Sequence, residues 1–206
     1  LLFIGLNFLQ ENMPNIHENP EILNFLHNYT DLGYGSYILF MLIGTALTIL
    51  IQSSSATMAL TLVMCANGWI GFDIAASMVL GENIGTTITA NLAAMVANTT
   101  AKRAAFAHFL FNLFGVAWVL AIFPIFLRWV AQLSINLGIG NPFTEVGSVP
   151  VALSLFHTCF NVANVFLLIW FTKVIARLVT RIIKSKETAD DAFTLKHIKI
   201  GLLSTP

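Results

Sequence analysis

The stretch "LTILIQSSSATMALTL", residues 47–62, places one glutamine and three serines in the middle of an apolar run. The apolar arms on either side, Tyr34 to Ile51 and Ala56 to Ala66, are each short for a membrane crossing, which takes roughly 20 residues. The second arm ends at Asn67-Gly68, a pair typical of turns. We therefore predict a re-entrant helical hairpin over 34–68, with the polar residues at its tip.

The composition of the whole chain is that of an integral membrane protein. Apolar residues make up 57% of the sequence and charged residues only 10%, and the mean hydropathy is +0.80. Soluble proteins carry about 25% charged residues. We predict an all-α membrane protein, with further membrane spans over 104–128 and 150–173. The net charge of zero gives no indication of a nucleic-acid partner, and we predict none.

A second polar interruption, "GENIGTT" at residues 81–87, divides the apolar segment 70–98. Glycines stand on both sides of Glu82-Asn83, which favours a break in the helix at this point. Irregular backbone at membrane depth is tolerated only where it is buried in protein or lines a cavity, and discontinuous helices are typical of transporter binding sites. We therefore predict a broken transmembrane helix beside the hairpin.

The residue types at the two interruptions suit a hard cation. Hydroxyl, amide and carboxylate oxygens are ligands for alkali or alkaline-earth ions, and the ends of broken helices add free carbonyl and N–H groups. No lysine or arginine occurs between Asp31 and Lys102. An anion bound here would therefore depend on helix dipoles, hydroxyl groups and a co-bound cation.

The pair "QSSSAT" and "GENIGTT" resembles the paired motifs of the sodium-phosphate cotransporter family, which comprises the type II transporters and their bacterial relatives. The resemblance extends over roughly residues 34–172 and is stronger to the bacterial branch. It implies an inverted-repeat symporter of sodium and inorganic phosphate, with sodium held at the breaks and phosphate between them. The implied site residues are Gln52, Ser53, Ser54, Ser55 and Thr57 in the hairpin, and Glu82, Asn83, Gly85, Thr86 and Thr87 in the broken helix.

The resemblance also implies partners and a location. The family has two QSSS copies and this chain contains one, so we expect the chain to be one half of the inverted repeat, paired with a second QSSS repeat of the same protein. The complete protein could also form a homodimer. Sodium ions are the coupling ions, and no other cofactor is expected. The expected location is the bacterial inner membrane, and no enzymatic activity is expected.

The sequence leaves other interpretations of these motifs open. A serine-rich patch in a membrane helix can also serve as contact between helices, and Glu82 could be protonated and bonded to the backbone. A structural membrane subunit without transport is one alternative function. An intramembrane serine hydrolase with His108 or His157 as its base is another, although no G-x-S-x-G sequence occurs.

A further polar pattern recurs on the two later apolar segments. "HFLFN" contains His108 and Asn112, and "HTCFN" contains His157 and Asn161. A spacing of four residues places each pair on one helical face. We favour a polar seam between two neighbouring helices, with a role in proton or substrate binding as the alternative.

The distribution of charge predicts the topology and the domain boundaries. Lys102 and Arg103, together with the basic residues from Lys173 to Lys186, predict that the 99–103 turn and the C-terminus are cytoplasmic. Outside the core repeat at 34–176, we predict the end of a truncated transmembrane helix at 1–10, an interfacial connector at 11–33, and a cytoplasmic linker at 177–206 toward a C-terminal domain.

Overall fold

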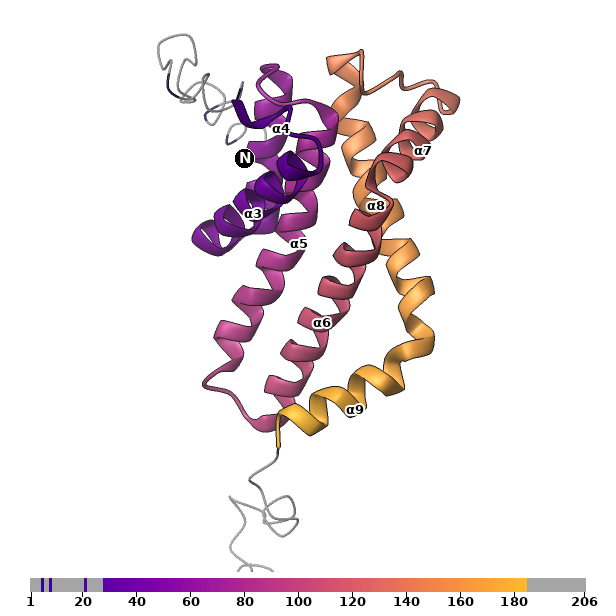
Figure 1. The fold of residues 1–206 in the computed structure, drawn as a ribbon. Coiled ribbons are helices and arrows are strands. Elements are labelled where there is room, and N and C mark those ends of the chain that lie inside the picture. Colours follow the sequence, from indigo (N-terminus) through magenta and orange to yellow (C-terminus); the bar gives the residue numbers. More distant parts are fainter. Residues whose placement is uncertain (1–4, 6–7, 9–20, 22–27, 185–206) are drawn as a thin grey trace, which may run out of the picture.

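The computed structural model describes residues 28–184, together with the isolated residues 5, 8 and 21. Within this part of the chain every regular element is helical, and no strand occurs (Figure 1). Most of the expected segments at 1–10, 11–33 and 177–206 lies outside the described residues. The elements are α3 (Tyr34–Ile51), α4 (Ser54–Ala66), α5 (Phe72–Ala94), α6 (Thr99–Ala121), α7 (Phe123–Asn136), η2 (Val146–Ser148), α8 (Val149–Leu168), η3 (Ile169–Phe171) and α9 (Thr172–Ile182).

The lengths and apolar composition of these helices agree with the prediction of a membrane protein. Among the described residues, three helical stretches are long and apolar enough to cross a bilayer: Tyr34–Ile51, Thr99–Ala121 and Val146–Ile182. Each reaches the length of about 18 to 20 residues that a hydrocarbon core requires. The all-helical membrane class predicted from the sequence is confirmed.

Helix α3 runs parallel to α5, the most buried helix of the fold. The Tyr37 hydroxyl donates to Asp73 Oδ2 at 3.5 Å, and about two turns further along both helices Thr45 Oγ1 donates to the Gly81 carbonyl at 3.0 Å. The partners advance in the same direction along both helices, which defines the parallel arrangement. The start of α3 therefore lies beside the start of α5.

Helix α4 folds back against α3 and returns toward the start of α5. Near the connection, Thr48 Oγ1 of α3 donates to Thr57 Oγ1 of α4 at 3.3 Å. At its far end, α4 joins α5 through residues 67–71. The 34–68 segment is thus a helical hairpin whose two ends lie near the first turn of α5 and whose tip lies beside the middle of α5.

The predicted break in the second motif is wrong, because α5 is one continuous α-helix through residues 81–87. The glycines of this motif are contact points for α3. A Cβ atom at Gly81 would overlap the backbone of Met41, and one at Gly85 would lie 2.7 Å from Cβ of Thr48. Small residues allow helix backbones to approach closely. These glycines let α3 pack closely against α5, and the backbone of α5 stays helical throughout.

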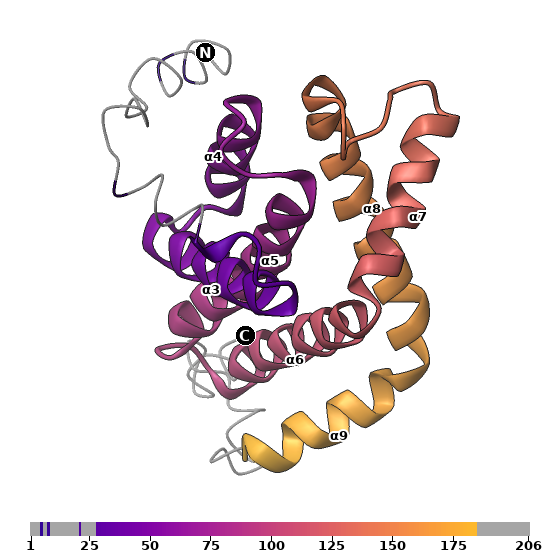
Figure 2. The ribbon, with the colours of Figure 1, turned by 45° about the horizontal axis from the view of Figure 1, so that its top comes forward.

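The remaining helices form the other side of the bundle, with α6 lying between the α3–α5 group and the α7–α8 pair (Figure 2). The predicted span 104–128 is divided at Ile122 between α6 and α7, because Pro124 lacks an N–H group and suits the first turn of a new helix. The predicted span 150–173 corresponds closely to α8 and η3. Aromatic contacts join the helices, including Tyr37 with Phe123, whose ring centroids are 4.8 Å apart.

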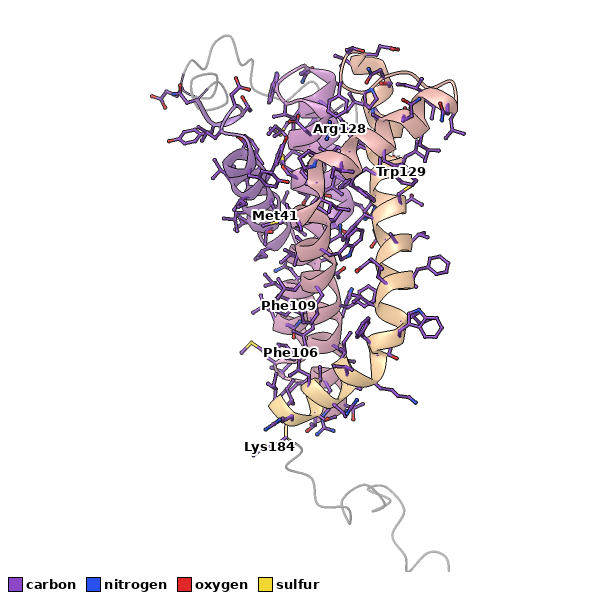
Figure 3. The ribbon with its side chains drawn as sticks, turned by 45° about the vertical axis from the view of Figure 1, so that its right-hand side comes forward. Met41, Phe106, Phe109, Arg128, Trp129 and Lys184 are labelled. Atoms are coloured by element: carbon purple, nitrogen blue, oxygen red, sulfur yellow. The ribbon has the colours of Figure 1, made fainter. Side chains whose placement is uncertain are left out.

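Helix α9 is amphipathic and turns beneath the bundle (Figure 1). Its buried residues Ile175 and Val179 are four apart and pack in one cluster with Leu110 of α6. Arg103 Nε donates to the Ile183 carbonyl at 3.0 Å, which fastens the end of α9 to the start of α6. Lys184 lies at this end of the molecule, far from Arg128 on α7 (Figure 3).

Candidate functional site

The tip of the hairpin is the point at which the chain leaves one helix and enters the next. Gln52 adopts a left-handed conformation with φ of 57°, and its N–H donates to the Thr48 carbonyl at 2.8 Å, which ends α3. Ser53 is the N-cap of α4, and its hydroxyl accepts from the Ala56 N–H at 3.3 Å. A serine at this position satisfies one of the free N–H groups of a helix start. The QSSS sequence therefore ends helix α3 and caps the start of helix α4.

A cavity of about 420 Å³ lies where this helix start meets α5, α6 and α8. Its wall brings together the serines of the hairpin, the central residues of the second motif and both His–Asn pairs. The lining residues are Ser54, Ser55, Met58, Glu82, Asn83, Thr86, His108, Asn112, His157 and Asn161. The two polar motifs, separated by about 25 residues in the sequence, are thus adjacent in space.

Helix α5 presents three oxygen-bearing side chains to this cavity, held by its own backbone and by α4. Asn83 Nδ2 donates to the Val79 carbonyl at 2.9 Å, and the Thr86 hydroxyl donates to the Glu82 carbonyl at 2.8 Å. Glu82 is 3% exposed, and its Oε1 atom accepts from the Thr61 hydroxyl at 3.0 Å. These bonds use donors, so the remaining oxygen lone pairs are available to a cation.

The His–Asn pairs from α6 and α8 line the same cavity, although we favoured a seam between helices. Within the described residues, no side-chain hydrogen bond joins His108 or Asn112 to His157 or Asn161. Asn161 Nδ2 instead donates to the His157 carbonyl of its own helix at 2.8 Å. Asn112 is 5% exposed, and its side chain forms no hydrogen bond with the described residues. The pairs therefore contribute polar groups to the cavity wall.

Five of the predicted site residues do not line this cavity. Gln52 and Ser53 form the connection between α3 and α4, and Gly85 packs against Thr48. Thr57 donates to the Ser53 carbonyl at 3.1 Å, and Thr87 donates to the Ile84 carbonyl at 2.7 Å. These residues shape the two helices around the cavity, and any ligand role for them stays a prediction.

Two residues of the site were missed in the sequence. Met58 lines the cavity, and Thr61 holds Glu82. Ser54, Met58 and Thr61 succeed one another at intervals of four and three residues along α4. Such intervals place residues on one helical face, so this periodicity was the signal that could have found them.

The charge of the cavity wall is unusual for a site that would hold an anion. Glu82 is the one acidic residue of the lining, and no lysine or arginine lines this cavity. Hydroxyl, amide and imidazole groups supply the remaining polar contacts. An anion here would require a cation to offset the Glu82 carboxylate.

The geometry gives no support to serine hydrolase chemistry. Nucleophilic serines are activated by a base within hydrogen-bond reach. Ser54 and Ser55 share the cavity with both histidines, yet no hydrogen bond joins either serine to either histidine. The serine side chains are instead free to contact a bound ion.

Comparison with known proteins gives curated relatives of which this chain covers less than half. "Uncharacterized protein YqeW" of Bacillus subtilis is 36% identical over 146 residues, which are 71% of this chain and 44% of that protein. "Putative inorganic phosphate export protein YjbB" of Salmonella typhimurium is 32% identical over 172 residues, or 84% of this chain and 30% of that protein. "Sodium-dependent phosphate transport protein 2C" of Homo sapiens is 37% identical over 126 residues, or 52% of this chain and 21% of that protein.

No solved structure matches the chain. The sequence pattern of the Na+/Pi-cotransporter family matches residues 1–158, which is most of the chain and includes both polar motifs. The resemblance inferred from the motifs is therefore confirmed: this chain belongs to the Na+/Pi-cotransporter family.

Proposed function

We propose that this chain forms one repeat of a symporter that carries inorganic phosphate together with sodium across the membrane. One observation carries the proposal. The cavity joins the hairpin serines to the second motif and contains a carboxylate without a basic side chain. Sodium bound beside Glu82 would supply the positive charge that an oxyanion requires at this site.

The proposed sodium ligands are oxygens of the hairpin tip and of α5. Ser55, Glu82 and Asn83 line the cavity from the two motifs, and Thr86 adds a hydroxyl one turn further along α5. Hard cations prefer such oxygen ligands. The start of α4 faces the same space, and N–H groups at a helix start favour an anion. Cation and anion would therefore bind close together, which makes the binding of each dependent on the other.

A second element is proposed to close the open side of the site. Inverted-repeat transporters hold the substrate between two related halves. The chain spans 44% of the Bacillus subtilis relative and 30% of the Salmonella typhimurium relative. A second QSSS repeat of the same protein would supply the opposite wall.

The proposed orientation places the basic end of the bundle in the cytoplasm of a bacterial cell. Lys102, Arg103 and the basic residues of α9 gather at this end, whereas the hairpin ends lie at the other. Basic residues favour the cytoplasmic side of a membrane. The hairpin would then be re-entrant from outside. Impermeant thiol reagents should label Leu32→Cys and Asn67→Cys from the same, outer side, and labelling from opposite sides would contradict the orientation.

The test of the function is phosphate uptake into proteoliposomes over a series of sodium concentrations, with the full-length transporter that contains this chain and its second repeat. We expect uptake to rise steeply with sodium and to be nearly lost in potassium. Ser55→Ala should lower the apparent sodium affinity tenfold to about a hundredfold, since one lost ligand contact costs about 1 to 3 kcal/mol. Phosphate uptake that is equally fast in potassium would contradict sodium coupling.

The matched control for this variant is Ser154→Ala. Ser154 is exposed on α8, and its hydroxyl donates to the Pro150 carbonyl of its own helix at 3.0 Å. We expect its sodium dependence to equal that of the unmodified protein. A protein that is folded and yet binds neither ion would favour the alternative of a structural subunit.

A further inference from the structure

The orientation of two asparagine amides in the cavity is fixed by their own helices. Asn83 donates through Nδ2 to the Val79 carbonyl, and Asn161 donates through Nδ2 to the His157 carbonyl. A carbonyl oxygen accepts hydrogen bonds and cannot donate them, so the nitrogen of each amide must face its helix. The Oδ1 atom of each side chain is thereby left as an acceptor, and both side chains line the cavity.

Other residues that line the same cavity carry hydrogen-bond donors. The hydroxyls of Ser54 and Ser55 and the amide of Asn112 form no hydrogen bond with the described residues. Asn112 is only 5% exposed, and nevertheless its amide has no partner in the described part of the chain. No buried side-chain nitrogen or oxygen atom among the described residues lacks a partner, so the amide atoms of Asn112 reach the cavity space, where a ligand or water can complete their hydrogen bonds.

Oxyanions differ in whether they carry a hydrogen-bond donor in addition to their acceptor oxygens. The hydrogen phosphate dianion has one P–OH group that must donate, and its other oxygens accept. Sulfate has the same charge and shape, but all of its oxygens accept only. A wall that combines free donors with free acceptors therefore matches an oxyanion that still carries a proton.

We infer that this cavity selects protonated oxyanions, hydrogen phosphate and its arsenate analogue, by accepting the P–OH or As–OH hydrogen on the amide oxygen of Asn161, while the amide oxygen of Asn83 faces the sodium ion. The inference rests on the proposed function and adds the basis of its selectivity. A site built to bond a substrate hydroxyl rejects an analogue without it, because the buried acceptor is then left unpaired. Facing an acceptor-only oxyanion, the amide oxygen of Asn161 would also meet its negative charge directly.

The test is competition for sodium-driven uptake of labelled phosphate by the protein in proteoliposomes. The competitors are arsenate, sulfate and monofluorophosphate, at a mildly alkaline pH at which phosphate is mostly the hydrogen phosphate dianion. Monofluorophosphate is the sharpest probe, because fluorine replaces the hydroxyl at nearly unchanged size and charge. We expect arsenate to compete within about tenfold of phosphate, and sulfate and monofluorophosphate to compete at least about 100-fold more weakly.

Variants of Asn161 test whether its amide oxygen causes the preference for phosphate over monofluorophosphate. Asn161→Leu removes the acceptor at similar volume and should narrow the preference for phosphate over monofluorophosphate by about tenfold. Asn161→Asp retains an acceptor oxygen and should retain the preference. Asn136→Leu is the control, because Asn136 is exposed on α7 and bonds to Gln132.

The outcomes separate this inference from the function on which it rests. Monofluorophosphate that competes as well as phosphate in the unmodified protein would overturn the inference and leave sodium-coupled transport intact. This comparison needs no variant, so it stands even if Asn161→Leu fails to fold. A protein that takes up neither phosphate nor arsenate with sodium would instead contradict the proposed function.

Discussion

The two polar motifs of this chain lie against each other, yet one interrupts the helix and the other does not. At Gln52 and Ser53 the backbone leaves α3 and starts α4. At residues 81–87 the backbone continues through α5 without interruption. Both motifs place polar groups in an apolar run, so composition alone does not separate them.

The difference lies in what each side chain does for the backbone. Ser53 caps a free N–H group, which stabilises a new helix start. Asn83, Thr86 and Thr87 donate back to carbonyls of their own helix three or four residues earlier, which is compatible with an intact helix. Glycine lowers helix propensity by about 1 kcal/mol relative to alanine, but close packing on α3 can offset that amount.

The largest expected effect is that of Gly81→Ala in α5. The added Cβ would overlap the Met41 carbonyl and lie 2.7 Å from the Thr45 nitrogen, so α3 must move away. We expect the free energy of unfolding in detergent micelles to fall by about 3 kcal/mol, despite the better helix propensity of alanine. Denaturant titration measures the change.

The control for this substitution is Gly147→Ala. An added Cβ at Gly147 meets nothing within 4 Å, so the stability should change by less than about 0.5 kcal/mol. Equal or greater stability of Gly81→Ala would show that the glycine does not mediate helix contact, and the contrast between the two motifs would lose its explanation.

A smaller effect is expected at the bond between Thr61 of α4 and Glu82 of α5. Thr61→Val keeps the shape of the side chain and removes the hydroxyl, which is bonded both to Glu82 Oε1 and to the Thr57 carbonyl of its own helix, each at 3.0 Å. A buried acceptor that loses its donor costs about 1 to 2 kcal/mol. Thr89→Val is the matched control, because the Thr89 hydroxyl donates only to the Thr86 carbonyl of its own helix. Equal unfolding midpoints of the two variants would show that the Thr61–Glu82 bond does not join α4 to α5.

The smallest effect is expected at Gln52, in the connection between α3 and α4. Gln52 has φ of 57°, a conformation that glycine adopts without steric cost. Gln52→Gly should therefore raise the free energy of unfolding by up to about 1 kcal/mol, measured in the absence of sodium and phosphate. A loss of stability would instead mean that contacts of the Gln52 side chain, and not the left-handed backbone alone, hold the tip of the hairpin together.

The sequence by itself determined the class of the protein and the pairing of its motifs. The low charge content and long apolar runs require a membrane environment, because few side chains could be solvated by water. The break at Gln52 to Ser55 was also predictable, because consecutive serines after a short apolar arm favour capping over continued helix. Family membership followed from the order of two short motifs.

Only the tertiary structure decided the role of the glycines and the extent of the cavity. Whether Gly81 breaks a helix or lets a neighbour approach depends on Met41, which lies 40 residues earlier in the chain. The convergence of Ser55, Asn83 and Asn161 likewise depends on how α4, α5 and α8 pack. Local sequence sets the face on which a side chain stands, whereas the partner of that face is set by packing between helices that are distant in sequence.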